Sequence, residues 1–108
     1  MRYAVQITED AQQDLLDIYA YVAQHDGMRA AEYVLDKLEE TCLQLESLPG
    51  RRHIPPELER LQISDYREVH WKPYRIIYQI PGRSVYVLAV LDGRRELQDL
   101  LTRRLLRF

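Results

Sequence analysis

The sequence has one cysteine, four glycines and no long apolar run among its 108 residues. A single cysteine excludes an intrachain disulfide, which is typical of a protein in a reducing compartment. The scattered glycines form no phosphate-binding loop, and no serine lies in a Gly-x-Ser-x-Gly turn. No stretch approaches the roughly 20 apolar residues of a membrane span, and the N-terminus lacks the apolar core of a signal peptide. We therefore expect a cytoplasmic protein that does not associate with a membrane.

Histidine and cysteine are also too sparse for an obvious metal site. His25, His53 and His70 lie far apart in the sequence, without the ligand spacing of a zinc site and without a second cysteine. Cys42 is in phase with leucines on a predicted helix, so we expect a buried small hydrophobe rather than a nucleophile. These residues predict neither a metal nor a cofactor. If the chain carries out chemistry, then arginine, tyrosine, carboxylate or a single histidine has to supply it.

Charge, by contrast, is plentiful and unevenly distributed. Residues 1–48 hold ten acids and three bases, for a net charge of −7, whereas residues 49–108 hold seven acids and twelve bases, for a net charge of +5. Thirteen of the fifteen bases are arginine, whose planar fork of donors suits phosphate and carboxylate. The basic half therefore favours an anionic partner, although opposite charges on two solvated faces would give the same counts.

Hydrophobic periodicity predicts a strand followed by a helical hairpin in the acidic half. Residues 2–7 alternate like a short strand. Thr8 is a candidate N-cap for a helix that ends near Gly27, which we expect to be a left-handed cap. A second helical pattern is stopped by the Pro-Gly pair at 49–50, and the short join between the two helices predicts an antiparallel hairpin.

The basic half predicts a loop, three strands and a final helix. Residues 49–65 contain three prolines and are expected to form a loop with a short helical turn at 57–61. Three runs predict strands: 66–71, 74–80 and 84–91. We expect the third of these strands to be covered on both faces. Leucines at helical spacing follow. The order β-α-α-β-β-β-α predicts an α+β fold, a helical hairpin packed on a small, mainly antiparallel sheet, as a single domain over residues 1–108.

Strand alternation brings several charged side chains to one face. Arg75 points from the less hydrophobic side of its strand, where a cation has to pair or meet a ligand. An ion pair with Glu68 or with a helix carboxylate is as plausible as a direct functional role. Glu68 and His70 share one face of the preceding strand. Arg94 and Arg95 follow the last strand, where paired guanidiniums suit an anion, although a solvated turn bonded to nearby acids is the alternative.

Three segments resemble the RelE/ParE superfamily, the toxins of type II toxin–antitoxin modules: PYRIIYQI (73–80), VYVLAVLDGRREL (85–97) and LLTRRL (100–105). They are similar to that family's YRxxY strand, to its apolar last strand ending in a Gly/His-Arg-Arg element, and to its arginine-bearing C-terminal segment. The opening YAVQITEDAQQDLLDIYAYV is also similar to the family's first strand and helix. The resemblance covers nearly the whole chain, with the 49–65 loop matching least, and implies the RelE/ParE toxin fold.

The resemblance implies one of two activities. RelE-like members cleave mRNA in the ribosome, which requires a base, an acid and cations on the phosphate. Arg75 and Arg95 match the cations, and Glu68 and His70 are left for proton transfer, because the C-terminal segment lacks the tyrosine or histidine of RelE-like enzymes. ParE-like members bind DNA gyrase and block replication without being nucleases. The stretch LDGRRELQDLL and the long helical hairpin are more similar to this branch, so a ParE-like plasmid-stabilisation toxin is favoured.

Either activity implies a cognate antitoxin, and the +5 half suits an acidic antitoxin tail. The candidate contacts with the target or the antitoxin are Arg75, Arg94, Arg95, Arg103, Arg104, Trp71 and Tyr74. Aromatic residues on strands more often belong to a core, so the last two have a structural alternative. A third possibility is a protein-interaction module without toxicity.

Overall fold

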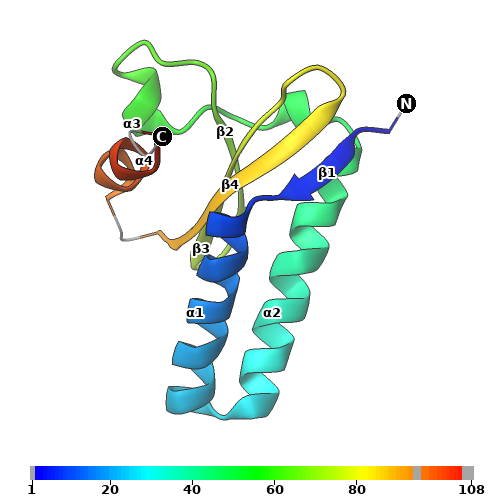
Figure 1. Ribbon diagram of the computed structural model, residues 1–108, viewed down its shortest axis with the longest axis vertical. Helices are drawn as coiled ribbons and strands as arrows, with labels where there is room; N and C mark the ends of the chain where they lie inside the picture. Colours follow the sequence, from blue (N-terminus) through cyan, green and yellow to red (C-terminus); the bar gives the residue numbers. More distant parts are fainter. Residues whose placement is uncertain (1, 94–95, 106–108) are drawn as a thin grey trace.

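A four-stranded sheet with helices on both faces forms the framework of the computed structural model, which describes residues 2–93 and 96–105 (Figure 1). The elements along the chain are β1 (Ala4–Ile7), α1 (Glu9–Asp26), α2 (Met28–Leu43), the 3-10 turns η1 (Gln44–Glu46) and η2 (Pro49–Arg51), α3 (Pro56–Glu59), β2 (Arg67–Trp71), β3 (Tyr74–Gln79), β4 (Ser84–Asp92) and α4 (Leu97–Leu105). The strand order is β1-β4-β3-β2, with β1 and β4 parallel and the other pairs antiparallel. The predicted α+β class is confirmed. Among the described residues, no helix has the length and apolarity to cross a membrane.

The helical hairpin of α1 and α2 is set by residues at the ends of its helices. Thr8 Oγ1 accepts a hydrogen bond from the Ala11 N–H (3.3 Å) and donates one to the Val87 carbonyl (2.9 Å), so the predicted N-cap also ties α1 to β4. Gly27 has the positive φ, 96°, that a left-handed cap requires, but its ψ of 165° is extended rather than helical. This conformation turns the chain so that α2 begins at Met28.

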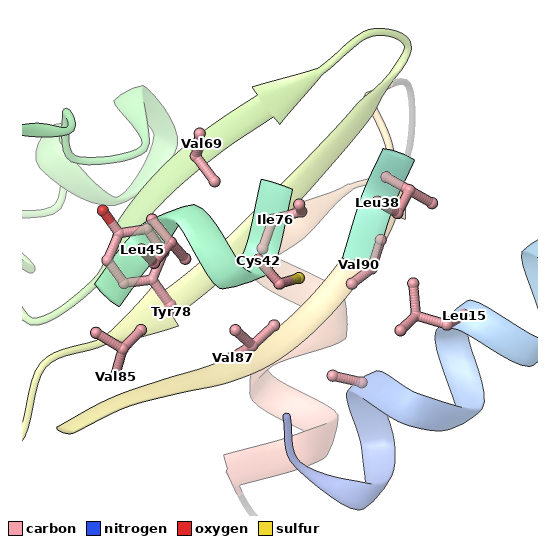
Figure 2. Close-up of a cluster of buried hydrophobic side chains, with 11 residues drawn as sticks. Leu15, Leu38, Cys42, Leu45, Val69, Ile76, Tyr78, Val85, Val87 and Val90 are labelled. Carbon is pink, nitrogen blue, oxygen red and sulfur yellow. The ribbon is translucent and has the colours of Figure 1, made fainter. Parts of the chain in front are cut away.

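One hydrophobic core lies between the hairpin and the sheet (Figure 2). Its buried members are Ala11, Leu15, Leu38, Cys42, Leu45, Val69, Ile76, Tyr78, Val85, Val87 and Val90. Cys42 is fully buried, and burial raises the pKa of its thiol to about 12. The prediction that Cys42 is a small hydrophobe of the core is confirmed.

A second core lies on the opposite face of the sheet, beneath α3 and α4. Its buried members are Leu58, Tyr66, Ile77, Ala89, Leu91, Leu97, Leu100 and Leu101. Ile77 lies on the face of β3 that we expected to be less hydrophobic, and it is fully buried. That expectation is wrong because leucines of α4 cover this face. The predicted burial of β4 on both faces is confirmed, since its residues contribute to both cores.

An ion pair fixes α4 to the helical hairpin. Arg104 Nη1 and Nη2 donate to the two carboxylate oxygens of Asp14 on α1, at 2.9 and 2.6 Å, and Nη1 also donates to the Leu88 carbonyl at 2.8 Å. Asp14 is buried, and it accepts a further hydrogen bond from the Val90 N–H at 2.9 Å. The hydrogen bonds to Asp14 raise the pKa of Arg104. α4 is therefore held both by its leucines and by a charged anchor.

Candidate functional site

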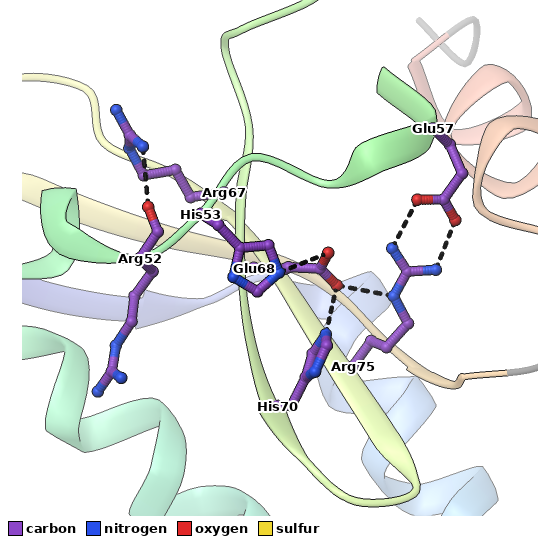
Figure 3. A network of polar contacts seen from close by, with 7 residues as sticks. All are labelled: Arg52, His53, Glu57, Arg67, Glu68, His70 and Arg75. Carbon is purple, nitrogen blue, oxygen red and sulfur yellow. Dashed lines mark hydrogen bonds and ion pairs between the residues drawn. The ribbon is translucent and has the colours of Figure 1, made fainter. Parts of the chain in front are cut away.

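Arg75 of β3 is the centre of a polar network (Figure 3). Its Nη1 and Nη2 atoms donate to the two carboxylate oxygens of Glu57 on α3, at 2.6 and 2.9 Å, and its Nε donates to Glu68 Oε1 at 2.7 Å. The contact with Glu57 raises the pKa of Arg75 and lowers the pKa of Glu57. The predicted alternative of an ion pair is confirmed with both partners, because Glu68 and a helix carboxylate bind the same guanidinium.

Glu68 of β2 joins Arg75 to two histidines. Its side chain is only 1% exposed, and its carboxylate accepts hydrogen bonds from His53 Nε2 at 3.0 Å and from His70 Nε2 at 2.8 Å. Burial alone would raise the pKa of Glu68, but hydrogen bonds from Arg75 and His70 outweigh burial and hold the pKa below its ordinary value. Glu68 is therefore a buried carboxylate that stays ionised.

The strand register explains why these groups meet. His70 of β2 pairs with Arg75 of β3, and Glu68 lies two residues before His70 on the same face. His53, from the segment between η2 and α3, forms an isolated bridge with β2, in which the Glu68 N–H donates to the His53 carbonyl at 3.0 Å. The loop predicted at 49–65 therefore returns to the edge of the sheet and brings both His53 and Glu57 to the strands.

His53 and His70 meet in the fold although they lie far apart in the sequence. Their ring centroids are 5.3 Å apart, and together with Glu68 they place possible metal-ligating atoms within 4.8 Å of one another. Sequence separation did not reveal this because the two rings meet only when the loop folds back onto β2. His25 stays apart on α1, where its Nδ1 lies 2.8 Å from the Tyr21 carbonyl of the same helix.

The network lines an open cleft of about 530 Å³ between α3, β2 and β3. Besides Glu57, Glu68 and Arg75, the cleft is lined by the cationic residues Arg60 and Lys72. The cleft therefore combines carboxylates, imidazoles and cations within a small space. Such a combination can bind an ion or move a proton.

Gly93 forms part of the cleft wall at the end of β4. Its N–H donates to the Pro73 carbonyl at 2.8 Å, and a Cβ at this position would lie 3.0 Å from the same oxygen. A side chain here would push against the Pro73 carbonyl, so this close backbone approach favours glycine.

Two members of the network, His53 and Glu57, were not among the sequence candidates. Glu57 had a detectable signal, since it begins the predicted helical turn at 57–61 and a helix carboxylate was expected to pair with Arg75. His53 had no such signal in the sequence. Its backbone bridge to Glu68 depends on long-range pairing that periodicity does not report.

The predicted arginines of the C-terminal segment have different surroundings. Arg104 is paired with Asp14, as described above, whereas Arg103 is exposed and its Nε donates a long hydrogen bond, 3.4 Å, to the Asp99 carbonyl. Arg94 and Arg95 lie outside the described residues. The structure therefore gathers Arg75 with Glu68 and His70, and leaves Arg103 and Arg104 outside that network.

The two predicted aromatic contacts lie at the turn between β2 and β3. Trp71 and Tyr74 pair across these strands, and both are partly buried against the first core. The Trp71 ring centroid is 6.0 Å from that of Tyr33 on α2, while Tyr74 also lines the cleft. Both residues are partly exposed and also pack against the first core.

Solved structures identify the class of the fold. A chain of the chromosomal ParDE TA system from P. aeruginosa matches with a TM-score of 0.72 and 16% sequence identity, over 84% of this chain and 96% of that chain. The E. coli toxin RelE, solved as a mutant in the free state, matches with a TM-score of 0.63 and 16% identity, over 98% of this chain and 100% of that chain. The fold is that of the RelE/ParE toxins.

Sequence comparison then identifies the family within that class. The family model for the ParE toxin of type II toxin–antitoxin systems, parDE, matches residues 5–97. Toxin ParE3 of Caulobacter vibrioides is 26% identical over 88 residues, which cover 78% of this chain and 80% of that protein. The chain belongs to the ParE toxin family of type II toxin–antitoxin systems, in agreement with the resemblance seen in its sequence.

Proposed function

We propose that this chain inhibits DNA gyrase, and thereby replication, and that a cognate antitoxin neutralises it. The observation that carries the proposal is the match of residues 5–97 to the ParE family. The similarity of the LDGRRELQDLL stretch and of the helical hairpin to the ParE-like branch supports the same choice. Gyrase and antitoxin are cytoplasmic, so the proposal also assigns the chain to the cytoplasm.

The state of Arg75 supports an activity that does not depend on a free cation in the cleft. Its side chain is 11% exposed, and its guanidinium donates to both Glu57 and Glu68. A phosphate would have to displace two carboxylates that already satisfy this cation, at a cost in desolvation and lost hydrogen bonds. Binding to a protein surface requires no such exchange, and the exposed Arg103 on α4 is available for it.

Charge and an aromatic side chain on an edge strand support the antitoxin as a partner. The P. aeruginosa structure is of a toxin–antitoxin system. In this chain, residues 49–108 carry a net charge of +5, which complements an acidic antitoxin segment. The strand β2 lies at an edge of the sheet and carries the partly exposed Trp71, an aromatic anchor of the kind that protein interfaces favour.

The proposal is tested with purified gyrase. The wild-type chain should block supercoiling and increase the amount of cleaved DNA, and its cognate antitoxin should reverse both effects. Replacing Arg94 and Arg95 together with alanine should abolish inhibition and leave the melting temperature nearly unchanged. The matched control replaces another adjacent arginine pair, Arg51 and Arg52, and should keep inhibition. A wild-type chain without effect on gyrase would refute the proposal, and a large loss of stability in the first variant would indicate a structural ion pair.

A second candidate function, ribosome-dependent cleavage of mRNA, is favoured by one specific observation. Glu68 accepts hydrogen bonds from both His70 and Arg75, so a carboxylate, an imidazole and a guanidinium share one cleft. These are the groups that acid–base catalysis at a phosphate requires. Primer extension on mRNA from a translating extract would detect the cuts, and His70→Ala should abolish them. A chain that affects neither gyrase nor translation, yet binds the antitoxin, would be an interaction module.

A further inference from the structure

We propose that His53, His70 and Glu68 form a binding site for a divalent transition-metal ion, for which Zn²⁺ is the best match. The two imidazole Nε2 atoms lie 3.0 and 2.8 Å from the two oxygens of one carboxylate. The three residues come from two separate parts of the chain, and their possible ligand atoms all lie within 4.8 Å of one another. The proposal goes beyond the function proposed above and does not depend on it.

The donor set selects the kind of metal. Two imidazole nitrogens and one carboxylate oxygen suit Zn²⁺ and its neighbours, whereas Mg²⁺ and Ca²⁺ prefer oxygen donors. With metal–ligand bonds of about 2.0–2.1 Å, tetrahedral ligand atoms lie about 3.3 Å apart. The nitrogen-to-oxygen distances of 2.8 and 3.0 Å are close to this value, so an ion can replace the two hydrogen bonds after small side-chain rotations.

Exposure leaves an entry path for the ion. The side chains of His53 and His70 are 57% and 41% exposed, while Glu68 beneath them is 1% exposed. The rings can therefore rotate while the carboxylate remains in place. All three residues line the open cleft, so a fourth ligand position would face solvent, as in zinc sites that keep a bound water.

The backbone and the neighbouring side chains hold the ligands in place. The Glu68 N–H donates to the His53 carbonyl at 3.0 Å, and Arg67 Nη1 donates to the Arg52 carbonyl at 2.9 Å, one residue before His53 (Figure 3). Arg75 Nε donates to Glu68 Oε1 and orients the carboxylate, as outer-shell partners do in metal sites.

The charge of the surroundings is compatible with a cation. Arg75 would repel a metal ion if its charge were uncompensated, but Glu57 binds both of its terminal nitrogens. Glu57 and Arg75 together are neutral, so the negative charge of Glu68 remains to attract a divalent ion against the repulsion of Arg60 and Lys72, which also line the cleft. A bound ion would also tie the segment that carries His53 to the edge strand β2, which stabilises the folded chain by mass action.

The test measures Zn²⁺ binding to the full chain, prepared without a histidine tag, by titration calorimetry. One equivalent should bind and raise the melting temperature, and Co²⁺ in its place should give the visible absorption of a tetrahedral site. His53→Ala and His70→Ala should each weaken binding by at least about tenfold, since even the loss of outer-shell partners costs that much. Circular dichroism melts without metal verify that both variants are folded, as expected for exposed rings.

His25→Ala is the matched control, because His25 is the remaining histidine and lies outside the cluster, on α1. It should bind Zn²⁺ as tightly as the wild-type chain. The absence of Zn²⁺ binding by the folded wild-type chain would overturn the proposal. Binding that His53→Ala and His70→Ala leave unchanged would overturn it as well. The measurement uses metal alone, so its outcome is independent of any effect on gyrase.

Discussion

At the scale of the residue, the cleft depends on Glu68. This side chain is almost completely buried, yet it remains ionised because Arg75 and His70 donate to its carboxylate, which also accepts a hydrogen bond from His53. A buried charge of this kind is tolerated only while its partners remain. Removing the carboxylate would leave Arg75 with Glu57 as its one acidic partner within this network.

Glu68→Gln should therefore lower the free energy of unfolding by about 3 kcal/mol, a loss typical of removing one member of a buried ion pair. Urea unfolding followed by circular dichroism measures the loss. The control is Glu59→Gln on α3, an exposed acid whose replacement should change the stability by less than about 0.5 kcal/mol. Equal stability of the two variants would show that the network does not support the fold.

Tyr78 has a different role, in the first core. Its hydroxyl donates to the Pro49 carbonyl at 2.6 Å, and burial raises the pKa of Tyr78 to about 12, despite the opposing effect of Arg52 and Arg67. This hydrogen bond ties η2 to β3. It also couples the stability of the fold to pH at the alkaline end.

Tyr78→Phe should cost about 1–2 kcal/mol at neutral pH, because it leaves the Pro49 carbonyl with only the long hydrogen bond, 3.5 Å, from the Arg52 N–H. The folded pKa lies above the unfolded value near 10, so the stabilisation is complete below pH 10 and is lost as the pH rises toward 12. Urea unfolding at several pH values measures the difference between wild type and variant. A difference that persists undiminished up to pH 12 would contradict this account.

At the scale of the element, the short helices are held by specific anchors. α3 has four residues and α4 has nine, lengths at which isolated helices are unstable in water. α3 is fixed by Leu58 in the second core and by the bidentate contact of Glu57 with Arg75. α4 is fixed by its leucines and by the pair of Arg104 with Asp14.

Arg104→Ala should loosen α4 and lower the free energy of unfolding by about 3 kcal/mol, because it leaves the buried Asp14 without its cation. Hydrogen exchange of the α4 amides, measured beside urea unfolding, would locate the effect. Arg103→Ala is the matched control on the adjacent, exposed position, and it should leave both measurements nearly unchanged. Similar exchange rates in the two variants would show that the leucines hold α4 in place without the ion pair.

At the scale of the whole molecule, the charge division follows the architecture. The acidic residues 1–48, with a net charge of −7, form β1, the helical hairpin and η1, while the basic residues 49–108, with +5, form the rest of the sheet and the helices beneath it. Figure 1 shows the hairpin and the C-terminal helix on opposite sides of the sheet. The contact of Asp14 with Arg104 joins the two halves.

Association with the proposed antitoxin should accordingly slow as salt is added. Screening shortens the electrostatic reach from about 10 Å at 0.1 M to about 3 Å at 1 M, so the association rate should fall by at least about tenfold. Biolayer interferometry at several salt concentrations measures the rate. Replacing Arg51 and Arg52 with alanine should make the dependence on salt shallower. A rate independent of salt would show that the charge division does not guide binding.

Patterns among residues close in sequence predicted most of the helices and strands. The errors concern contacts between segments that are distant in sequence. The Thr8 cap, the helical hairpin and the three later strands were predicted because each depends on residues close in sequence. The meeting of His53 with His70 was missed because it requires a loop to return to an edge strand. The burial of Ile77 was missed because α4 supplies its cover from twenty residues further along the chain.

The amino-acid order by itself determined the α+β class and the family resemblance, since both follow from periodicity and motifs. It gave the pairing of Arg75 with an acid as one of two alternatives. Only the tertiary structure decided which acids pair with Arg75, that two histidines converge on Glu68, and that a second core closes the other face of the sheet. The physical reason is that these features depend on contacts between segments distant along the chain. Strand register and loop closure create such contacts, and local propensity does not encode them.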